Sequence, residues 1–201
     1  MKSTDLPGKQ RILLLNGSPR TNGLVSQWIA ALDAEARAAG FTTETLRVAS
    51  LDVSPCTGCM TCRSTNRCVL PDDGAQHVLR AMQAADIVII GTPTYWGNIP
   101  GTLKSVFDRI VYGMMSEDSH ARPRPLMKGK RAVVVATCST PWPFNRLFRQ
   151  SQGAVNALRE ILRWSGIRLI GTIQQGGTRG HTSLGAREHA RCRRIIKRLT
   201  H

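Results

Sequence analysis

The amino-acid sequence predicts an α/β protein built on a doubly wound, five-stranded parallel sheet with helices on both faces. Short apolar runs, typical of strands buried on both sides, alternate along the 201 residues with segments whose apolar residues recur at helical spacing. Gly, Pro and Asp separate these segments where helices are expected to begin or end. Strands that alternate with helices indicate crossover connections, and therefore a parallel sheet.

The strand predictions rest on continuous apolar runs such as RILLLN, IVII and AVVVAT. Runs of four to eight apolar residues are typical of strands at the centre of a parallel sheet. The five expected strands lie at residues 11–16, 42–48, 87–90, 132–137 and 168–173.

Helices are expected after each strand. In the first helix apolar residues recur from Val25 to Ala36, and Gly40 ends it. Asp72 and Asp73 offer side-chain oxygens to cap the second helix. Later segments comprise a helix at about 101–112, a polar, Pro-containing loop at 113–130, a long helix carrying residues 147–162, and a basic C-terminal helix.

Five strands in one domain, residues 1–201, favour a flavodoxin-like sheet with the strand order 2-1-3-4-5. In this fold a ligand lies beyond the carboxyl ends of the strands, where the strand order switches between strands one and three. The loops that follow the first, third and fourth strands are therefore expected to carry the chemistry.

Composition narrows the compartment and the partners. The chain has no apolar run long enough to span a bilayer and no apolar signal segment near its start, so we expect no membrane insertion and a cytoplasmic location. The formal charge of +15 has two interpretations. The basic residues near the C-terminus could contact nucleic acid, but the solvated outer face of a helix is favoured, and nucleic-acid binding is not expected.

The loop after the first strand, NGSPRTNG, has the composition of a phosphate site. Gly17 and Gly23 permit tight turns, Ser18 and Asn22 offer donors, and Arg20 offers a charged fork. The free N–H groups at the start of the following helix point back at this loop. An ordinary polar turn is the alternative. The loop lacks G-x-G-x-x-G and is not a Walker loop, so the sequence does not support a dinucleotide-binding protein or an NTPase.

Two further loops bring aromatic residues to the same edge of the sheet. Residues 91–101 contain Tyr95 and Trp96, and residues 137–146 contain Trp142 and Phe144. These rings could pack in the core, but after central strands they suit a flat ring ligand. One loop for a phosphate and two for a planar ring describe a mononucleotide such as FMN.

At this point the chain resembles the flavodoxin-like NADPH-dependent FMN reductases, a family that includes the iron–sulfur flavoproteins. The resemblance lies in GSPRTNG, in CTGCMTC with a later C and DD, in GTPTYWGNIPGTLK with FDR, and in KGKRAVVVAT. It implies non-covalent FMN, a homodimer or homotetramer, and electron transfer from NAD(P)H to a quinone, flavin or other small acceptor. An electron-transfer carrier without its own substrate is the alternative activity.

The resemblance also implies site residues. Those expected to bind FMN are Ser18, Arg20, Asn22 and Gly23 at the phosphate, Pro93, Thr94, Tyr95, Trp96, Gly97 and Asn98 at the ring, and Thr137, Ser139 and Thr140 at its other edge. Backbone N–H groups of residues 94–98 are expected to stabilise negative charge on the reduced ring. No catalytic side chain is expected.

Three further assignments concern single residues. His181 is a candidate proton source, although a surface role is favoured. Arg122 and Arg124 in the long loop are candidates to select NADPH by its extra phosphate. The family loop usually continues G-N-T, whereas Leu24 and Val25 follow Gly23 here, with Ser26 as a possible substitute donor. Each hydrogen bond lost to the phosphate would cost about 1.5–3 kcal/mol.

Four cysteines, Cys56, Cys59, Cys62 and Cys68, have the spacing C-x-x-C-x-x-C-x5-C. This spacing resembles the cluster motif of the iron–sulfur flavoproteins and implies a possible [4Fe–4S] cluster. Free thiols without a cluster are the slightly favoured alternative. Zinc is less favoured because structural zinc sites usually join two separated ligand pairs, and a reducing compartment disfavours disulfides. Cys138 and Cys192 lie outside the motif and are expected to be ordinary buried or helical cysteines.

Overall fold

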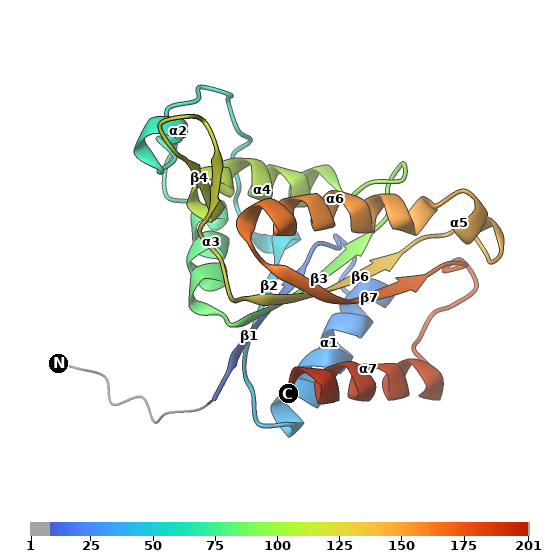
Figure 1. Cartoon of the computed structure of the whole chain (residues 1–201). Helices are drawn as coiled ribbons and strands as arrows, with labels where there is room; N and C mark the ends of the chain where they lie inside the picture. Colours follow the sequence, from blue (N-terminus) through green and yellow to red (C-terminus); the bar gives the residue numbers. More distant parts are fainter. Residues whose placement is uncertain (1–8, 201) are drawn as a thin grey trace.

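A computed structural model, which describes residues 9–200, shows a five-stranded parallel sheet between two layers of helices (Figure 1). The strand order β2-β1-β3-β6-β7 is the predicted order 2-1-3-4-5 counted over the parallel strands, so the predicted fold is confirmed. The strands are β1 (Arg11–Asn16), β2 (Thr42–Arg47), β3 (Ile87–Pro93), β6 (Arg131–Thr137) and β7 (Arg168–Gln175).

The helices divide between the two faces of the sheet. Helices α1 (Leu24–Ala38) and α7 (Ala186–Leu199) share one apolar cluster with the sheet, and the remaining long helices share the other. Those on the second face are α3 (Gly74–Ala84), α4 (Gly101–Met114) and α6 (Gln150–Ser165).

The two clusters follow from the period of two along each strand. In β1, Leu13 and Leu15 belong to the cluster under α3, α4 and α6, whereas Ile12 and Leu14 belong to the one under α1 and α7. All four side chains are at most 1% exposed. Full burial of such a side chain stabilises the fold by about 1.5–3 kcal/mol, which is why continuous apolar runs form these central strands.

Two of the predicted helix boundaries are confirmed. Asp73 caps α3, because its side chain accepts the N–H of Ala75 at 2.9 Å. Gly40 has a φ of 88° just after α1, a left-handed conformation that favours glycine. Asp72 does not cap the helix and instead forms an ion pair with Arg80 at 2.7 Å.

The segment predicted as a polar, Pro-containing loop at 113–130 contains an antiparallel hairpin, β4 (Met115–Glu117) with β5 (Pro123–Pro125). Pro123 and Pro125 argue against a strand in a sequence, but a strand in a two-stranded ribbon can tolerate missing N–H groups. The hairpin lies beside α2 (Cys62–Thr65), away from the carboxyl ends of the parallel strands (Figure 1). Arg122 and Arg124 are therefore remote from the expected FMN edge of their own chain.

Other elements end slightly differently from the prediction. β2 ends at Arg47, and η1 (Val48–Ser50) follows it. The long fourth helix is divided, because Arg149 has a φ of 50° between α5 (Phe144–Leu147) and α6. Within residues 9–200, no helix combines the length and apolar character that a membrane span requires.

Candidate functional site

The loop that follows β1 is held by the side chain of its first residue. Asn16 is buried; its Oδ1 accepts the N–H of Ser18 at 3.0 Å, and its Nδ2 donates to Oγ of Ser26 at 2.9 Å. Ser26 Oγ in turn donates to the carbonyl of Arg20 at 2.7 Å. The Ser26 hydroxyl is therefore occupied within the loop. Asn16 was not singled out from the sequence, where a polar residue ending an apolar strand was its only signal.

The start of α1 offers backbone donors to this loop. Gly23 occupies the N-cap position without a side-chain cap, so the first-turn N–H groups of Leu24, Val25 and Ser26 have no capping partner within the described chain. Leu24 and Val25 bury their side chains in the core. The positive end of the α1 dipole and these N–H groups form an anion-binding arrangement, and two side-chain donors typical of the family are absent from it.

The loop after β3 is a tight reverse turn. Tyr95 and Asn98 exchange two backbone hydrogen bonds of 2.9 Å, and both central residues have positive φ, 51° at Trp96 and 72° at Gly97. These signs are those of a type I′ turn. Tyr95 is 46% exposed and Trp96 is fully exposed, so their rings are not core residues.

The loop after β6 is tied to the neighbouring loops. Thr94 N–H donates to the Thr137 carbonyl at 2.7 Å, which joins the second loop to the third. Cys138 N–H donates to Gln175 at the end of β7, and Gly177 N–H donates to the Thr140 carbonyl at 2.8 Å. These bonds hold residues 137–140 against the segment after β7.

Gly153 in α6 sets the position of the Tyr95–Asn98 turn. A Cβ added to Gly153 would lie 1.9 Å from the carbonyl oxygen of Gly97. Backbone therefore packs directly on backbone here, and only glycine permits it. This contact could not be predicted from the sequence, because a glycine inside a helical pattern usually only weakens the helix.

The residues predicted to bind FMN lie at the carboxyl edge of the sheet (Figure 1): Pro93 and Thr137 end β3 and β6, and the others lie in the loops after β1, β3 and β6. Their exposure differs. Ser18 and Thr137 are buried; Gly23, Pro93, Thr94, Gly97 and Thr140 are half-buried; Arg20, Asn22, Tyr95, Trp96, Asn98 and Ser139 are exposed.

Two observations at this edge bear on a bound ligand. Thr94 Oγ1 is buried and has no hydrogen-bond partner within residues 9–200, as expected of a site that is completed by another group. Of the N–H groups in residues 94–98, those of Thr94, Tyr95 and Asn98 donate to backbone carbonyls. Only Trp96 and Gly97 keep theirs for a ligand, which narrows the predicted set. His181 is exposed, in agreement with the favoured surface role.

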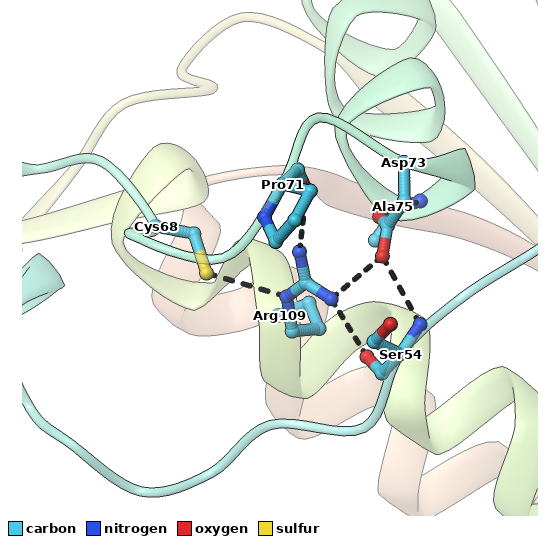
Figure 2. Close-up of polar contacts among 6 residues, drawn as sticks. All are labelled: Ser54, Cys68, Pro71, Asp73, Ala75 and Arg109. Atoms are coloured by element: carbon cyan, nitrogen blue, oxygen red, sulfur yellow. Dashed lines mark hydrogen bonds and ion pairs between the residues drawn. The ribbon is translucent and has the colours of Figure 1, made fainter.

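The cysteine loop is fastened to α4 by a buried arginine (Figure 2). The Arg109 side chain is 0% exposed and donates Nη1 to Asp73 and to the Ser54 carbonyl, both at 2.7 Å. Its Nη2 donates to the Pro71 carbonyl at 3.1 Å, and its Nε to Cys68 Sγ at 3.3 Å. One guanidinium thus holds both ends of the loop.

Asp73 completes this clamp. Besides capping α3, its carboxylate accepts the N–H of Ser54 at 3.0 Å. Burial alone would raise the pKa of Asp73, but the hydrogen bonds from Ser54 and Ala75 and the ion pair with Arg109 outweigh it and lower the pKa. The carboxylate therefore stays charged opposite the arginine at neutral pH.

The four thiols of the motif line one cavity of about 60 Å³ against α4. All four are unpaired, and within the described residues no three Cys, His, Asp or Glu side chains are arranged to hold a metal ion. Burial, and then the electrostatic effect of the neighbouring Cys68, raises the pKa of Cys62, whereas hydrogen bonds from Thr61 lower the pKa of Cys59. This loop conformation does not fit a cluster, and the four-cysteine ligand set stays a prediction.

The remaining two cysteines are buried, as predicted. Burial raises the pKa of Cys138, and it raises that of Cys192 to about 12. Both thiols are therefore protonated at neutral pH and behave as small apolar side chains.

The sequence profile of the NADPH-dependent FMN reductases matches residues 10–180. The chain belongs to this family. The family predicted from the sequence motifs is thereby confirmed, and it is consistent with the three loops at the carboxyl edge.

Curated relatives of this FMN reductase family member include iron–sulfur flavoproteins. One from Methanosarcina thermophila is 38% identical over 101 residues, which are 50% of this chain and 52% of the relative. One from Archaeoglobus fulgidus is 34% identical over 115 residues, 57% of this chain and 48% of the relative. The chain therefore spans about half the length of these relatives. An FMN-dependent NADH:quinone oxidoreductase from Pseudomonas savastanoi pv. phaseolicola is 39% identical over 66 residues, 32% of this chain and 33% of that protein.

Solved structures of FMN reductase-like proteins share the fold over nearly the whole chain. The NAD(P)H:quinone oxidoreductase from Methanothermobacter marburgensis superposes with a TM-score of 0.77 at 17% identity, covering 96% of this chain and 98% of that one. An FMN-dependent NADH-azoreductase from Bacillus anthracis, solved with FMN, has a TM-score of 0.72 at 15% identity and covers 96% and 100%. At these identities the likeness establishes the fold.

Proposed function

We propose that residues 1–201 form a single FMN-binding domain that passes electrons from NAD(P)H to a quinone, a flavin or a similar small acceptor. The observation that carries the proposal is the meeting of three loops at the carboxyl edge, with uncapped N–H groups of α1 at one end and an exposed aromatic turn at the other. Family membership supports the same activity.

The α1 N-terminus would hold the FMN phosphate. Its free N–H groups and the helix dipole favour a negative charge, and exposed Arg20 and Asn22 lie in the same loop. Buried Ser18 and Asn16 would fix the loop around the phosphate. Because the side chains of Leu24 and Val25 are buried, the phosphate would be bound by backbone N–H groups more than by side-chain hydroxyls and amides.

The Tyr95–Asn98 turn and residues 137–140 would hold the ring. FMN held there would supply the hydride and electron-transfer chemistry that links NAD(P)H to the acceptor. The chain's own residues bind and orient the reactants, and the N–H groups of Trp96 and Gly97 are the ones free to stabilise negative charge on the ring. Donor and acceptor would use the same exposed face in turn, so initial-rate plots should show parallel lines.

The test is a spectrum and an assay on the purified protein. We expect a flavin spectrum that stays with the protein after FMN is added and unbound FMN is removed, and steady NADPH oxidation in the presence of a soluble quinone or free FMN. A colourless protein that neither binds added FMN nor oxidises NADPH would contradict the proposal. FMN binding with only a single reduction and no turnover would instead identify an electron carrier.

A second candidate is an iron–sulfur flavoprotein that acts as an electron-transfer carrier. Two observations favour it: four thiols line one cavity, and the relative from Methanosarcina thermophila bears that name. Because the loop conformation does not fit a cluster, this function requires the loop to rearrange. Anaerobically purified wild type should then contain iron, Cys62→Ser should lose it, and Cys138→Ser should keep it; iron-free wild type would exclude it.

Assembly and location complete the proposal. The exposed aromatic residues Tyr95, Trp96, Trp142 and Phe144 near the FMN edge suit a homodimer or homotetramer, which light scattering would measure. The unpaired thiols suit the reducing cytoplasm.

A further inference from the structure

Arg47 lies next to the phosphate loop although it belongs to another strand. It is the last residue of β2 and pairs in register with Asn16, the last residue of β1. Neighbouring strands are about 5 Å apart, so the side chain of Arg47 begins one strand away from the loop at residues 16–23. This proximity could not be predicted from the sequence alone, because it depends on the pairing of β1 with β2.

The guanidinium of Arg47 faces that loop without a charged partner. Its Nη2 donates to the Pro19 carbonyl at 3.4 Å, and Pro19 stands between Ser18 and Arg20 in the loop. Its Nε is buried and has no hydrogen-bond partner within residues 9–200. No carboxylate of the described chain forms an ion pair with it.

Such an arrangement is costly without a ligand. The Nε N–H of Arg47, buried without an acceptor, forfeits its hydration, while the side chain as a whole is half-buried. The phosphate of FMN would carry about 1.5–2 negative charges at neutral pH, as other phosphate monoesters do. Within the loop, only exposed Arg20 has a positive side chain to offset that charge. Leu24 and Val25 bury apolar side chains and offer the phosphate no side-chain donor.

We propose that Arg47 is a further binding residue for the FMN phosphate, reaching the loop from β2 and replacing the donors missing at residues 24 and 25. The inference rests on the proposed function. The inference predicts that Arg47 affects the binding of the phosphate and not that of the ring. This distinguishes it from a general role of Arg47 in folding.

The experiment compares FMN with riboflavin, which has the same ring and no phosphate. Both are titrated into flavin-free protein and followed by flavin fluorescence, for wild type, Arg47→Met, Arg47→Lys and a control, Arg37→Met. Arg37 also donates to a backbone carbonyl, that of Thr43 at 3.5 Å, but from the last turn of α1. Thermal unfolding and circular dichroism verify the fold of each variant.

Arg47→Met should weaken FMN binding about 10- to 100-fold and change riboflavin binding less than about twofold. Arg47→Lys should fall between, because an ammonium keeps the charge and loses the fork. Arg37→Met should match wild type for both flavins. The fall of FMN affinity with added salt should also be shallower in Arg47→Met than in Arg37→Met.

Unchanged FMN affinity in Arg47→Met, or an equal loss for FMN and riboflavin, would overturn the inference. If Arg47→Met fails to fold, Arg47→Lys is compared with wild type by the ratio of its FMN affinity to its riboflavin affinity. A ratio equal to that of wild type would overturn the inference. Wild type that binds neither flavin refutes the proposed function itself, and the inference with it. Wild type that binds FMN while the Arg47 variants behave alike refutes the inference only.

Discussion

At Gly153 a missing side chain determines where the exposed aromatic turn lies. The carbonyl of Gly97 occupies the space that a Cβ would fill. This turn also positions the N–H groups of Trp96 and Gly97, the only two in residues 94–98 without a backbone acceptor. A residue on a helix thus controls the geometry of a loop on a different element.

Replacing this glycine should move the turn. We expect Gly153→Ala to destabilise the fold by about 1–3 kcal/mol through overpacking and to weaken FMN binding. Gly101→Ala, also in the first turn of a helix, is the control, because a Cβ there meets nothing within 4 Å. Urea unfolding and FMN titration measure both effects. Equal behaviour of the two variants would show that the turn can yield without cost.

At the scale of elements, the cysteine loop depends on one buried ion pair. Arg109 and Asp73 bind each other, and both bind Ser54, where the cysteine loop begins. Arg109 also binds Pro71, where the loop ends. Removing one partner of a buried pair leaves the other uncompensated, which typically costs about 3–5 kcal/mol. The loop and α4 are therefore energetically coupled.

This coupling predicts a dependence on pH. The folded-state pKa of Asp73 is lowered, so its ionised form stabilises the fold above the unfolded pKa, near 4, and that stability is lost as the pH falls through the folded value. The stability of wild type should therefore fall more steeply below about pH 4 than that of Asp73→Asn. The hydrogen bond from Arg80 also lowers the pKa of Asp72, but this pair is exposed, so Asp72→Asn should change the slope much less than Asp73→Asn does. Chemical denaturation at a series of pH values measures these slopes; parallel curves for wild type and Asp73→Asn would contradict the assignment.

The β4–β5 hairpin belongs with the cysteine loop and not with the FMN edge. Arg63 of α2 forms an ion pair with Glu117 at 2.7 Å, and Tyr112 donates to the same carboxylate at 3.1 Å. The double variant Arg122→Ala/Arg124→Ala should therefore keep its KM for NADPH within about twofold of wild type. Steady-state kinetics measure this, and a large rise in KM would restore the original assignment of these arginines.

The sequence predicted elements whose signals are local. Apolar runs located the five parallel strands, and Asp73 located the start of α3, because burial and capping depend on neighbouring residues. Contacts between distant residues were not predictable. Arg109 looked like one more charged residue in an amphipathic helix, and the orientation of Arg47 depends on the pairing of β1 with β2. The residues predicted to bind FMN were placed by family motifs, and the contacts that hold their loops required the fold.

At the scale of the whole molecule, the excess positive charge lies largely on solvated surfaces. In α7, Cys192, Ile196 and Leu199 face the core, while the basic residues between them are exposed, which confirms the interpretation as an outer helix face. Exposed charge of this kind is screened within about 8 Å at physiological ionic strength.

This distribution predicts weak and non-selective contact with nucleic acid. We expect mixed-sequence DNA to bind detectably at low salt and to dissociate at physiological ionic strength, as a gel-shift or anisotropy titration would show. Retention at physiological salt would support a nucleic-acid partner and would call for charge reversals on α7, beginning with Arg194→Glu.

The arginine clamp has a consequence for how this protein can change over evolution. Besides the bonds to Ser54 and Pro71, Gly74 N–H donates to the Asp52 carbonyl at 2.8 Å, so the chain leaves and returns at nearly the same point. A loop whose ends are held together in this way can vary in length at little cost, because doubling its length adds only about 0.6 kcal/mol to the free energy of loop closure. Thiols can be gained, lost or respaced between the anchors while the sheet and the loops at its carboxyl edge are inherited unchanged.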